Sequence, residues 1–372
     1  MVGAGLAGAA SAWHLARAGA RVTVVETEAD AGRHASGRNA GILRTAMPDP
    51  VLHGLAAESR GFYLDPPAGF ADGPLVRGRG VWLAAGPAHA DSLRGWARNP
   101  ACASGLEERN PAELRKRVPE LAGDLAAAFL QPQEGEFDVH RVLHGFLRGA
   151  AAAGARIRLA APATALLLRN GACTGVRLAD EVLEADAVLL AGGAWARDLP
   201  AACGLPLAVR PYRRHLLCTG PLPEVDPAGP VVWLLGEEFY FRPESGGLLL
   251  CACDHQPVAA ERGEQSTGTA AEDLAVRVER WLPAFAEAPA ARIWAGTRTF
   301  APDGRFVLGS DPRLTGLFWA AGLGGHGVTC APAVGRRAAA AVRGTGPDDD
   351  DPTVAAALAP ARLLGALAAP AA

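Results

Sequence analysis

Three glycines at the start of the chain, Gly3, Gly5 and Gly8, are spaced as G-x-G-x-x-G, with Leu6 and Ala7 between the last two. In a turn of this kind the first glycine permits a tight bend and the second lets the backbone approach a pyrophosphate. The third lets the following helix pack close to a sheet. The N-terminus of that helix presents free N–H groups and a partial positive charge to phosphates. This spacing therefore predicts a nucleotide-binding turn.

A carboxylate follows at the distance that such a site requires. A helical run over residues 9–19 leads into the apolar run 21–25, which ends at Glu26. Glu26 lies 18 residues after Gly8, within the usual range for an acid that accepts hydrogen bonds from ribose hydroxyls. Glycine-rich turns are common in a chain with 45 glycines. The helix, the strand and the acid in this order nevertheless predict a dinucleotide site, which we extend to the adjacent Thr27.

The strand that should precede the glycine turn is short. A hydrophobic strand of about five residues is expected there, yet only Val2 separates Met1 from the turn. We expect either that further sequence upstream adds a Val/Ile-rich run, or that most of the central strand is missing. In the second case the affinity for the dinucleotide would be poor.

A loop dense in glycine and small polar residues follows the acid, from Glu28 to Gly41. An ordinary surface loop has such a composition, but so does a second phosphate-and-flavin cradle made of backbone N–H groups and short side chains. Its place directly after the ribose-binding acid favours the cradle, and FAD over NAD as the ligand. The predicted contacts are Arg33, Ser36, Gly37, Arg38, Asn39, Ala40 and Gly41.

Composition excludes several classes of function. The chain has 372 residues, of which 49% are hydrophobic and 20% charged, as in a globular protein with a substantial core. The net charge of −3 gives no electrostatic case for nucleic acid. Seven cysteines form no C-x-x-C pair and no zinc spacing, so we expect no metal, and their scattered positions suit a reducing cytoplasm.

No apolar run reaches the roughly 18 residues that span a bilayer, and no signal peptide is visible. The predicted location is the cytoplasm, and these residues do not decide whether the protein attaches to the periphery of the inner membrane.

The pattern of elements predicts an α/β fold with two domains. Helical periods occur near 50–65, 88–98, 111–117, 139–153, 271–282 and 331–342, and Asn170-Gly171 predicts a hairpin. We expect a doubly wound, Rossmann-like FAD-binding domain from residues 1–80, 140–205 and 292–343. Residues 81–139 and 206–291 would form an α+β substrate domain on an antiparallel sheet. The low-complexity tail 344–372 is predicted to be a loop and a loosely held helix.

Two further glycine turns extend the nucleotide site. Ligands of a doubly wound sheet lie at the carboxyl ends of its parallel strands. The apolar run 187–190 ends in such a turn, which makes Ala191, Gly192 and Trp195 candidate contacts. A second turn opens the last long helix, where N–H groups could stabilise a reduced flavin anion. Its candidate contacts are Gly324, Gly325, His326, Gly327 and Val328.

Together these motifs resemble the D-amino-acid-oxidase-like FAD-dependent oxidoreductases. The glycine turn, the loop 36–41, the turn 191–195, the stretch 298–304 and the turn 322–327 occur here in the order found in that family, up to about residue 343. Glycine oxidase, sarcosine oxidase and the D-amino-acid dehydrogenases are members. Stretches at 58–70 and 237–243 are most similar to bacterial D-arginine dehydrogenase.

The resemblance implies an enzyme that moves hydride from the Cα of an amino acid or amine to flavin N5. The imine product would hydrolyse to an oxo acid. Arg298 and Tyr240 would hold the substrate carboxylate, with Arg213 or Arg214 as a further active-site arginine. His326 or solvent would take the amine proton. The electron acceptor, oxygen or a quinone, is not readable from the residues.

Arg298 and Tyr240 could each have a purely structural role. Arg298 could instead form a structural ion pair with Asp303 or Glu237, and Tyr240 could be a core residue. Oxidation of a 2-hydroxy acid or polyol, or a non-catalytic flavin-binding subunit, are the alternative functions.

The sequence departs from the D-arginine dehydrogenase pattern at Ile42, Met47 and Val81, where that enzyme has a histidine, a tyrosine and a glutamate. Since the glutamate reads a cationic side chain, we expect a neutral, more apolar amino acid or a secondary amine. Gly296 stands where sarcosine oxidases have their flavin-linking cysteine, so FAD is expected to bind non-covalently.

Overall fold

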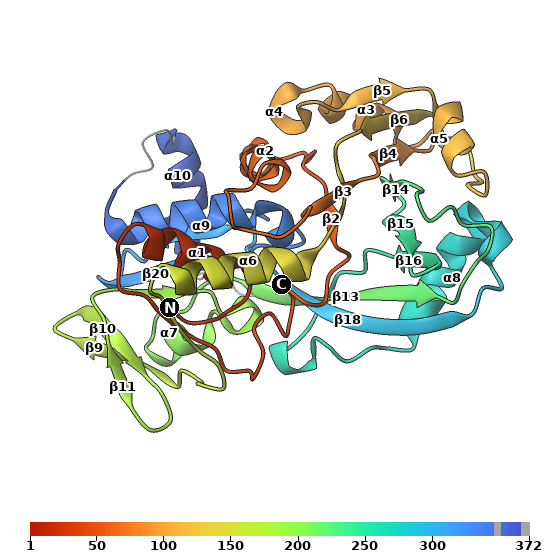
Figure 1. The fold of residues 1–372 in the computed structure, drawn as a ribbon. Coiled ribbons are helices and arrows are strands. Elements are labelled where there is room, and N and C mark those ends of the chain that lie inside the picture. Colours follow the sequence, from red (N-terminus) through yellow and green to blue (C-terminus); the bar gives the residue numbers. More distant parts are fainter. Residues whose placement is uncertain (346–350, 366–372) are drawn as a thin grey trace.

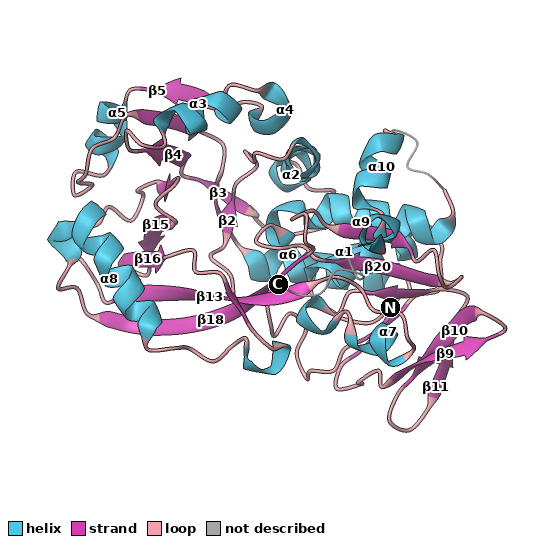
Figure 2. Cartoon of the chain, turned by 180° about the vertical axis from the view of Figure 1, so that it is seen from behind, coloured by secondary structure: helices cyan, strands magenta, loops and turns pink. Residues whose placement is uncertain are grey.

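The chain folds into two lobes in a computed structural model that describes residues 1–345 and 351–365 (Figure 1). One lobe contains the long helices α1 (Leu6–Arg17), α6 (Val139–Ala152) and α9 (Gly327–Arg343). Two long strands, β13 (Arg210–Thr219) and β18 (Ala290–Phe300), run side by side from this lobe into the other (Figures 1 and 2). The lobes are therefore joined by paired backbone.

A parallel sheet forms the centre of the first lobe. Its order is β8–β1–Val2–β12–β20–β19, and the last strand, β19, runs antiparallel. The run 188–190 is buried throughout, as expected for a strand covered on both faces. The helix α1 contacts both α6 and α9. The strands are β1 (Thr23–Val25), β8 (Arg156–Arg158), β12 (Val188–Leu190), β19 (Val307–Ser310) and β20 (Leu317–Ala321).

Val2 occupies the middle of this sheet. It pairs in parallel with Val25 on one side and Leu190 on the other. The Val2 amide donates to the carbonyl of Leu189 over 2.9 Å, and the Gly3 amide donates to that of Val25 over 2.8 Å. The backbone before the glycine turn is thus fixed at the central position that the doubly wound fold requires.

The second lobe is built on a large mixed sheet. Its order is β17–β13–β16–β15–β14–β4–β6–β5, with β18 paired to β13 along its length. The predicted antiparallel arrangement holds in each of these pairings except β4 with β14, which run parallel. The strands not yet given are β4 (Val81–Ala85), β5 (Glu107–Arg109), β6 (Ala127–Gln131), β14 (Val231–Leu234), β15 (Phe239–Glu244), β16 (Gly247–Cys251) and β17 (Gln256–Pro257).

Smaller sheets complete the fold. Asn170 and Gly171 have φ of 52° and 75° and form the predicted tight turn between β9 and β10. The strands of the smaller sheets are β2 (Ile42–Leu43), β3 (Val76–Gly78), β7 (Gly135–Phe137), β9 (Ala165–Arg169), β10 (Ala172–Arg177) and β11 (Val182–Glu184).

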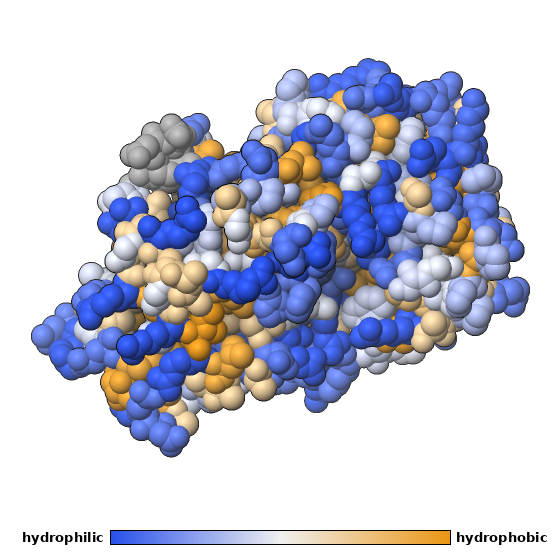
Figure 3. Space-filling model, in the orientation of Figure 1, coloured by the Kyte–Doolittle hydropathy of each residue, from blue (hydrophilic) through white to orange (hydrophobic). Residues whose placement is uncertain are grey.

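The predicted helices occur close to their expected positions. The last long helix, α9, begins four residues earlier than its apolar period suggested. None of the described helices is long and apolar enough to cross a membrane, and hydrophilic residues cover most of the face seen in Figure 3. The other helices are α2 (Pro50–Leu64), α3 (Ala90–Ala97), α4 (Pro100–Ala103), α5 (Pro111–Arg117), α7 (Asp198–Ala202), α8 (Thr269–Trp281) and α10 (Pro352–Leu358), with short 3₁₀ turns η1 (Gly193–Trp195), η2 (Ala260–Arg262), η3 (Pro283–Phe285) and η4 (Pro360–Leu363).

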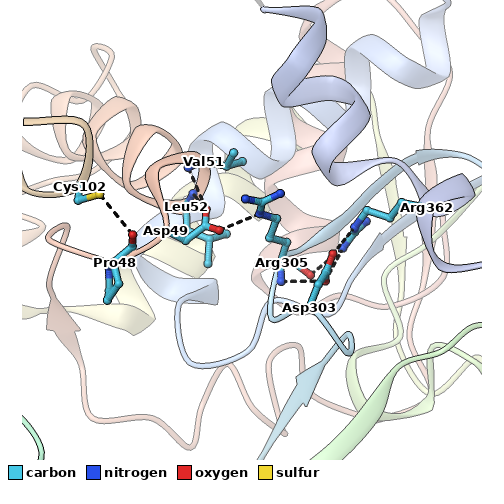
Figure 4. A network of polar contacts seen from close by, with 8 residues as sticks. All are labelled: Pro48, Asp49, Val51, Leu52, Cys102, Asp303, Arg305 and Arg362. Carbon is cyan, nitrogen blue, oxygen red and sulfur yellow. Dashed lines mark hydrogen bonds and ion pairs between the residues drawn. The ribbon is translucent and has the colours of Figure 1, made fainter. Parts of the chain in front are cut away.

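The described part of the tail is docked, not loosely held. Leu358 and Leu363 are buried, at 1% and 3% exposure. Arg362 lies against Asp303, with 2.7 Å between Nε and Oδ2, while Arg305 pairs with Asp49 near the start of α2 (Figure 4). The rest of the predicted tail, residues 346–350 and 366–372, lies outside the described residues.

The α/β fold class with two parts is confirmed, whereas the predicted domain boundaries stay a prediction. Most of β18 falls in our predicted FAD-binding domain, yet it pairs with β13 of the predicted substrate domain.

Candidate active site

The first glycine turn is packed so tightly that side chains are excluded from it. A Cβ added at Gly8 would lie 2.0 Å from the carbonyl oxygen of Gly3, and one at Gly3 would lie 2.5 Å from that of Ala191. Gly3 also has a φ of 103°, which favours glycine. These contacts hold the start of α1 against the ends of β1 and β12, as a nucleotide-binding turn requires.

The N-terminus of α1 is open to an anion. Its cap residue, Gly5, offers no side chain, and the first turn contains no acidic residue. The amide of Leu6 donates to Ser36 Oγ over 3.0 Å, but those of Ala7 and Gly8 have no partner among the described residues. Free amides at a helix N-terminus bind phosphate, so the residues present fit the pyrophosphate of FAD.

Glu26 lies at the end of β1, next to this turn. One of its carboxylate oxygens accepts from the Ala4 amide over 2.7 Å and the other from the Glu28 amide over 3.1 Å. Thr27 is exposed beside it. The acid is therefore held at the carboxyl edge of the sheet, where the ribose of a dinucleotide would lie.

The loop after Glu26 is fixed by its own polar side chains. The side-chain Nδ2 of Asn39 donates to the backbone carbonyl of Ser36, and its Oδ1 accepts from the backbone amide of Gly41, both over 2.8 Å. Arg38 pairs with Glu264, with 2.9 Å between Nε and Oε2, and Ala40 is buried. Gly37 and Arg33 are exposed.

The other two glycine turns lie near the same edge. The backbone of Ala191 packs against Gly3. The Trp195 ring lies 4.4 Å from that of His34. In the last turn, Gly324 has a φ of 52°, and a Cβ there would lie 2.6 Å from the Phe300 ring. The amides of Gly325, Gly327 and Val328 have no partner within the described residues, so the N-terminus of α9 is also open.

Strand register shows which of the two adjacent arginines shares a face with Arg298. In the antiparallel pair β13–β18, Tyr212 lies opposite Arg298 and Arg214 lies opposite Gly296. Side chains alternate along strands, so Arg214 and Arg298 lie on one face and Arg213 on the other. Arg213 donates there to the carbonyl of Arg262 over 2.8 Å. The structure therefore brings together Arg214 and Arg298, but not Arg213.

Arg298 makes no ion pair with either acid considered for it. Asp303 pairs with Arg362, and Glu237 pairs with Arg280 over 2.8 Å. Arg298, only 7% exposed, donates instead to two backbone carbonyls, those of Thr297 over 2.9 Å and Arg38 over 3.3 Å. A buried guanidinium without a carboxylate is costly unless a ligand supplies one.

Tyr240 lies on β15 within the same group of residues. Its side chain is 3% exposed, and its ring lies 4.3 Å from that of Trp233. Burial raises its pKa well above the ordinary value, with Arg214 acting in the opposite direction. Tyr240 is therefore a neutral hydroxyl, able to donate a hydrogen bond beside two guanidinium groups.

His326 belongs to the last glycine turn and lies near the arginines of the site. It is the cap residue of α9. Burial lowers its pKa to about 3, assisted by the positive charges of Arg44, Arg214 and Arg298. His326 is consequently uncharged at neutral pH and a weak base.

Two residues of this site were missed by the sequence analysis. Arg44 is 9% exposed, and its guanidinium carbon lies 4.0 Å from the centre of the Trp233 ring. The available signal was a charged residue inside the mainly apolar run 42–47, whose other polar residue is Thr45. Nothing in the sequence around Trp233 indicated a place in the site, because that place depends on the pairing of Trp233 with Tyr240 between β14 and β15.

The three positions that depart from the D-arginine dehydrogenase pattern are packing residues. Met47 and Val81 are each 1% exposed within hydrophobic clusters, and Ile42 packs against the cluster that contains Tyr240. At Gly296 a Cβ would lie 2.7 Å from the Arg38 carbonyl oxygen and 3.3 Å from Arg298 Nη1. Glycine there leaves room for the guanidinium.

A protein-family model described as FAD dependent oxidoreductase, the DAO family, matches residues 1–341. The chain belongs to this family. The resemblance to this family that the motifs indicated is therefore confirmed. The protein is an oxidoreductase, and its cofactor is FAD. Among the described residues, no group of three or more histidine, cysteine or acidic side chains is placed to hold a metal.

This oxidoreductase is similar to several named proteins. It is 27% identical to glycine oxidase of Pseudomonas putida, over 90% of this chain and 91% of that protein. It is 28% identical to 4-methylaminobutanoate oxidase (formaldehyde-forming) of Paenarthrobacter nicotinovorans over 91% of this chain, but spans only 43% of that relative. The structure of glycine oxidase from Geobacillus kaustophilus superposes with a TM-score of 0.79 at 26% identity, covering 94% of this chain and 95% of that one.

Proposed function

We propose that this oxidoreductase oxidises the Cα–N bond of an amino acid or secondary amine that carries a carboxylate. The observation that supports this proposal most directly is the group formed by Arg298, Tyr240 and Arg214: the first two are buried, Arg214 is half-buried on the same face as Arg298, and Arg298 has no acidic partner among the described residues. Relatives named as oxidases of glycine and of 4-methylaminobutanoate support this class of substrate.

Arg298 and Tyr240 would bind and orient the substrate. An arginine fork meets a carboxylate with two parallel hydrogen bonds, and the neutral Tyr240 hydroxyl would donate a third. Fixing the carboxylate fixes the direction of the neighbouring Cα–H bond, an orientation effect of several kcal/mol in favourable cases (about 7 or more in model reactions). Arg214, held by the carbonyls of Cys253 and Asp254 at 3.2 Å each, adds positive charge on the same face.

The backbone amides of three turns would hold the cofactor: 3–8, 191–195 and 324–328. The loop 33–41 would add further contacts. Glu26 would accept from a ribose hydroxyl. Bound FAD supplies the acceptor for the hydride that leaves Cα. With a glycine at 296 and no cysteine, the attachment would be non-covalent.

The proton on the substrate nitrogen would go to solvent. His326 is the titratable side chain of the α9 turn, but its lowered pKa makes it too weak a base to take a proton from an ammonium group at neutral pH. Loss of one proton from the ammonium nitrogen and of hydride from Cα leaves a protonated imine. Water then converts that imine to an oxo acid and ammonia or an amine.

Anaerobic bleaching of the flavin absorbance tests the proposal. Purified holoenzyme is mixed with D- and L-amino acids, N-methyl amino acids, and the 2-hydroxy acids of the same carbon skeletons. We expect some of the amines to bleach the flavin and the hydroxy acids not to. Bleaching by hydroxy acids alone would support alcohol oxidation instead, and a yellow protein that nothing bleaches would support a non-catalytic flavin-binding subunit.

A further inference from the structure

Arg44 lies where a guanidinium is costly to bury. It directly follows β2 and is 9% exposed, and its neighbours Leu43 and Thr45 are buried as well. Removing an ionised side chain from water carries a large penalty unless another charge or a set of hydrogen bonds compensates it. Burial accordingly lowers the pKa of Arg44 from its ordinary value.

No direct ion pair or hydrogen bond with a described protein group compensates this charge. Within residues 1–345 and 351–365, the Arg44 side chain makes no ion pair and no hydrogen bond, and its Nε is buried without a partner. Its recorded contact is the Trp233 ring at 4.0 Å, a cation–π arrangement that fixes the direction of the fork without satisfying its N–H groups.

The acid that acts on Arg44 is already occupied. Glu134 is fully buried and accepts from both the amide and the hydroxyl of Thr45. Burial raises the pKa of Glu134 to about 7, so this carboxyl is partly protonated at neutral pH. It is therefore a weak counter-charge for a guanidinium.

Positive charge exceeds negative charge around this site. Arg44, Arg214 and Arg298 all act on His326. Asp254, the acid beside Arg214, pairs with His215 at 2.9 Å. A single substrate carboxylate on Arg298 would leave Arg44 without an anion.

We propose that Arg44 binds a second carboxylate of the substrate, so that the preferred substrate is an amino or imino dicarboxylate. This inference rests on the proposed function, and it replaces the neutral, more apolar substrate that the sequence analysis expected from Val81 without taking Arg44 into account. The substrate would bind with one carboxylate on Arg298 and Tyr240, and the other on Arg44 beside Trp233.

Two other arginines show that stacking on tryptophan does not by itself explain Arg44. Arg280 lies 5.2 Å from the Trp281 ring and Arg292 lies 5.0 Å from the Trp294 ring. Both arginines are exposed, so water solvates their charges. Arg292 is therefore a matched control, with the same kind of stacking and no buried charge.

The first experiment measures binding to wild-type holoenzyme, by calorimetry and by perturbation of the flavin spectrum. Glutarate, which cannot be oxidised at a Cα–N bond, is compared with glutaramate, in which one carboxylate is an amide. We expect glutarate to bind at least about 30-fold more tightly, the effect of losing one charge-assisted contact. Equal affinity for the two would overturn the proposal, whether or not any amine is oxidised.

The second experiment measures kcat/KM for matched substrates with wild type, Arg44→Gln and Arg292→Gln. The pairs are glutamate and glutamine in both enantiomers, and iminodiacetate with its monoamide. We expect Arg44→Gln to lower kcat/KM for the dicarboxylates about 100-fold, mainly through KM, and to change that for the monoamides less than about threefold. Arg292→Gln should leave both unchanged.

The outcomes separate this inference from the proposed function. If monocarboxylic amines reduce the flavin as well as dicarboxylic ones, the second carboxylate site is wrong and the amine oxidation stands. Equal losses for both members of each pair would make Arg44 a positioning residue for Trp233 and Tyr240, which also overturns the proposal. If Arg44→Gln lost FAD, the wild-type glutarate comparison alone would decide.

Discussion

The cofactor half and the substrate half of this site are made in different ways. The cofactor half uses backbone: amides at the starts of α1 and α9, and glycines such as Gly8 whose missing side chains let chain segments touch. The substrate half uses side chains that meet only through strand register, such as Arg214 and Arg298 across β13 and β18. One half is encoded by short stretches, the other by pairing between distant ones.

This difference determines what a substitution should do to each half. A side chain added to a glycine turn acts on the position of whole helices, because it collides with backbone. A side chain removed from the substrate half deletes a contact but leaves the backbone in place. The two halves should therefore fail separately, the first by losing FAD and the second by losing the substrate with FAD still bound.

Gly8→Ala tests the cofactor half and should have the largest effect. Its Cβ would lie 2.0 Å from the Gly3 carbonyl oxygen, so α1 must move away from the sheet. We expect the purified protein to retain less than about a tenth of its FAD, and activity to fall to background, because the amides of Ala7 and Gly8 no longer face the pyrophosphate. FAD content is measured by absorbance after denaturation.

Gly54→Ala is the control for that substitution. Gly54 lies inside α2, and a Cβ there meets no atom within 4 Å. It should keep FAD and stabilise the fold by about 0.5–1 kcal/mol, since alanine favours a helix interior over glycine. A Gly8→Ala protein with normal FAD affinity would show that this turn does not hold the dinucleotide.

The cofactor half was largely predictable from sequence for the same reason. Short sequence patterns predict the local backbone shape of each part of this half. They are the three glycines at 3–8, the loop 36–41 and the turn 322–327. The substrate half was only partly predictable. Sequence could not decide between Arg213 and Arg214, because the choice depends on which face of β13 meets β18, and it gave no sign that Trp233 and Arg44 stack.

Arg298→Met tests the substrate half. Methionine keeps the volume and apolar stem of the side chain but removes the fork that would hold the carboxylate. We expect kcat/KM for the best amine to fall by roughly 10²–10³-fold, from loss of two charge-assisted hydrogen bonds at about 1.5–3 kcal/mol each, partly offset by water. FAD content should stay at the wild-type level.

Arg292→Met, on the same strand, is the matched control for Arg298→Met. Arg292 is exposed, so its loss should change kcat/KM by less than about threefold. If Arg298→Met instead lost FAD, and kept the wild-type KM when assayed with excess FAD, the two halves would not be separable as the structure indicates, and Arg298 would belong to the cofactor half.

His326→Asn addresses the point where the two halves meet, and its kinetic effect should be the smallest. Because burial and three arginines lower the pKa of His326 to about 3, the residue is neutral across the working range. The pH profile of kcat/KM should therefore keep its shape, with the acidic limb set by the substrate amine, and the rate should change less than about threefold. Disappearance of a limb near pH 6–7 in the variant would instead identify His326 as the proton acceptor.

Stability against pH gives His326 a second, independent readout. Between pH 6.5 and about 3 the unfolded chain protonates this histidine while the folded protein does not, so the unfolded state binds the extra proton. The wild-type free energy of unfolding should fall as pH drops below 6.5, by up to about 1.4 kcal/mol per pH unit from this residue. Urea titrations at pH 5 and pH 7 should show a smaller difference for His326→Asn than for wild type. An unchanged difference would mean that burial and the neighbouring arginines together do not lower the pKa of His326 in the folded protein.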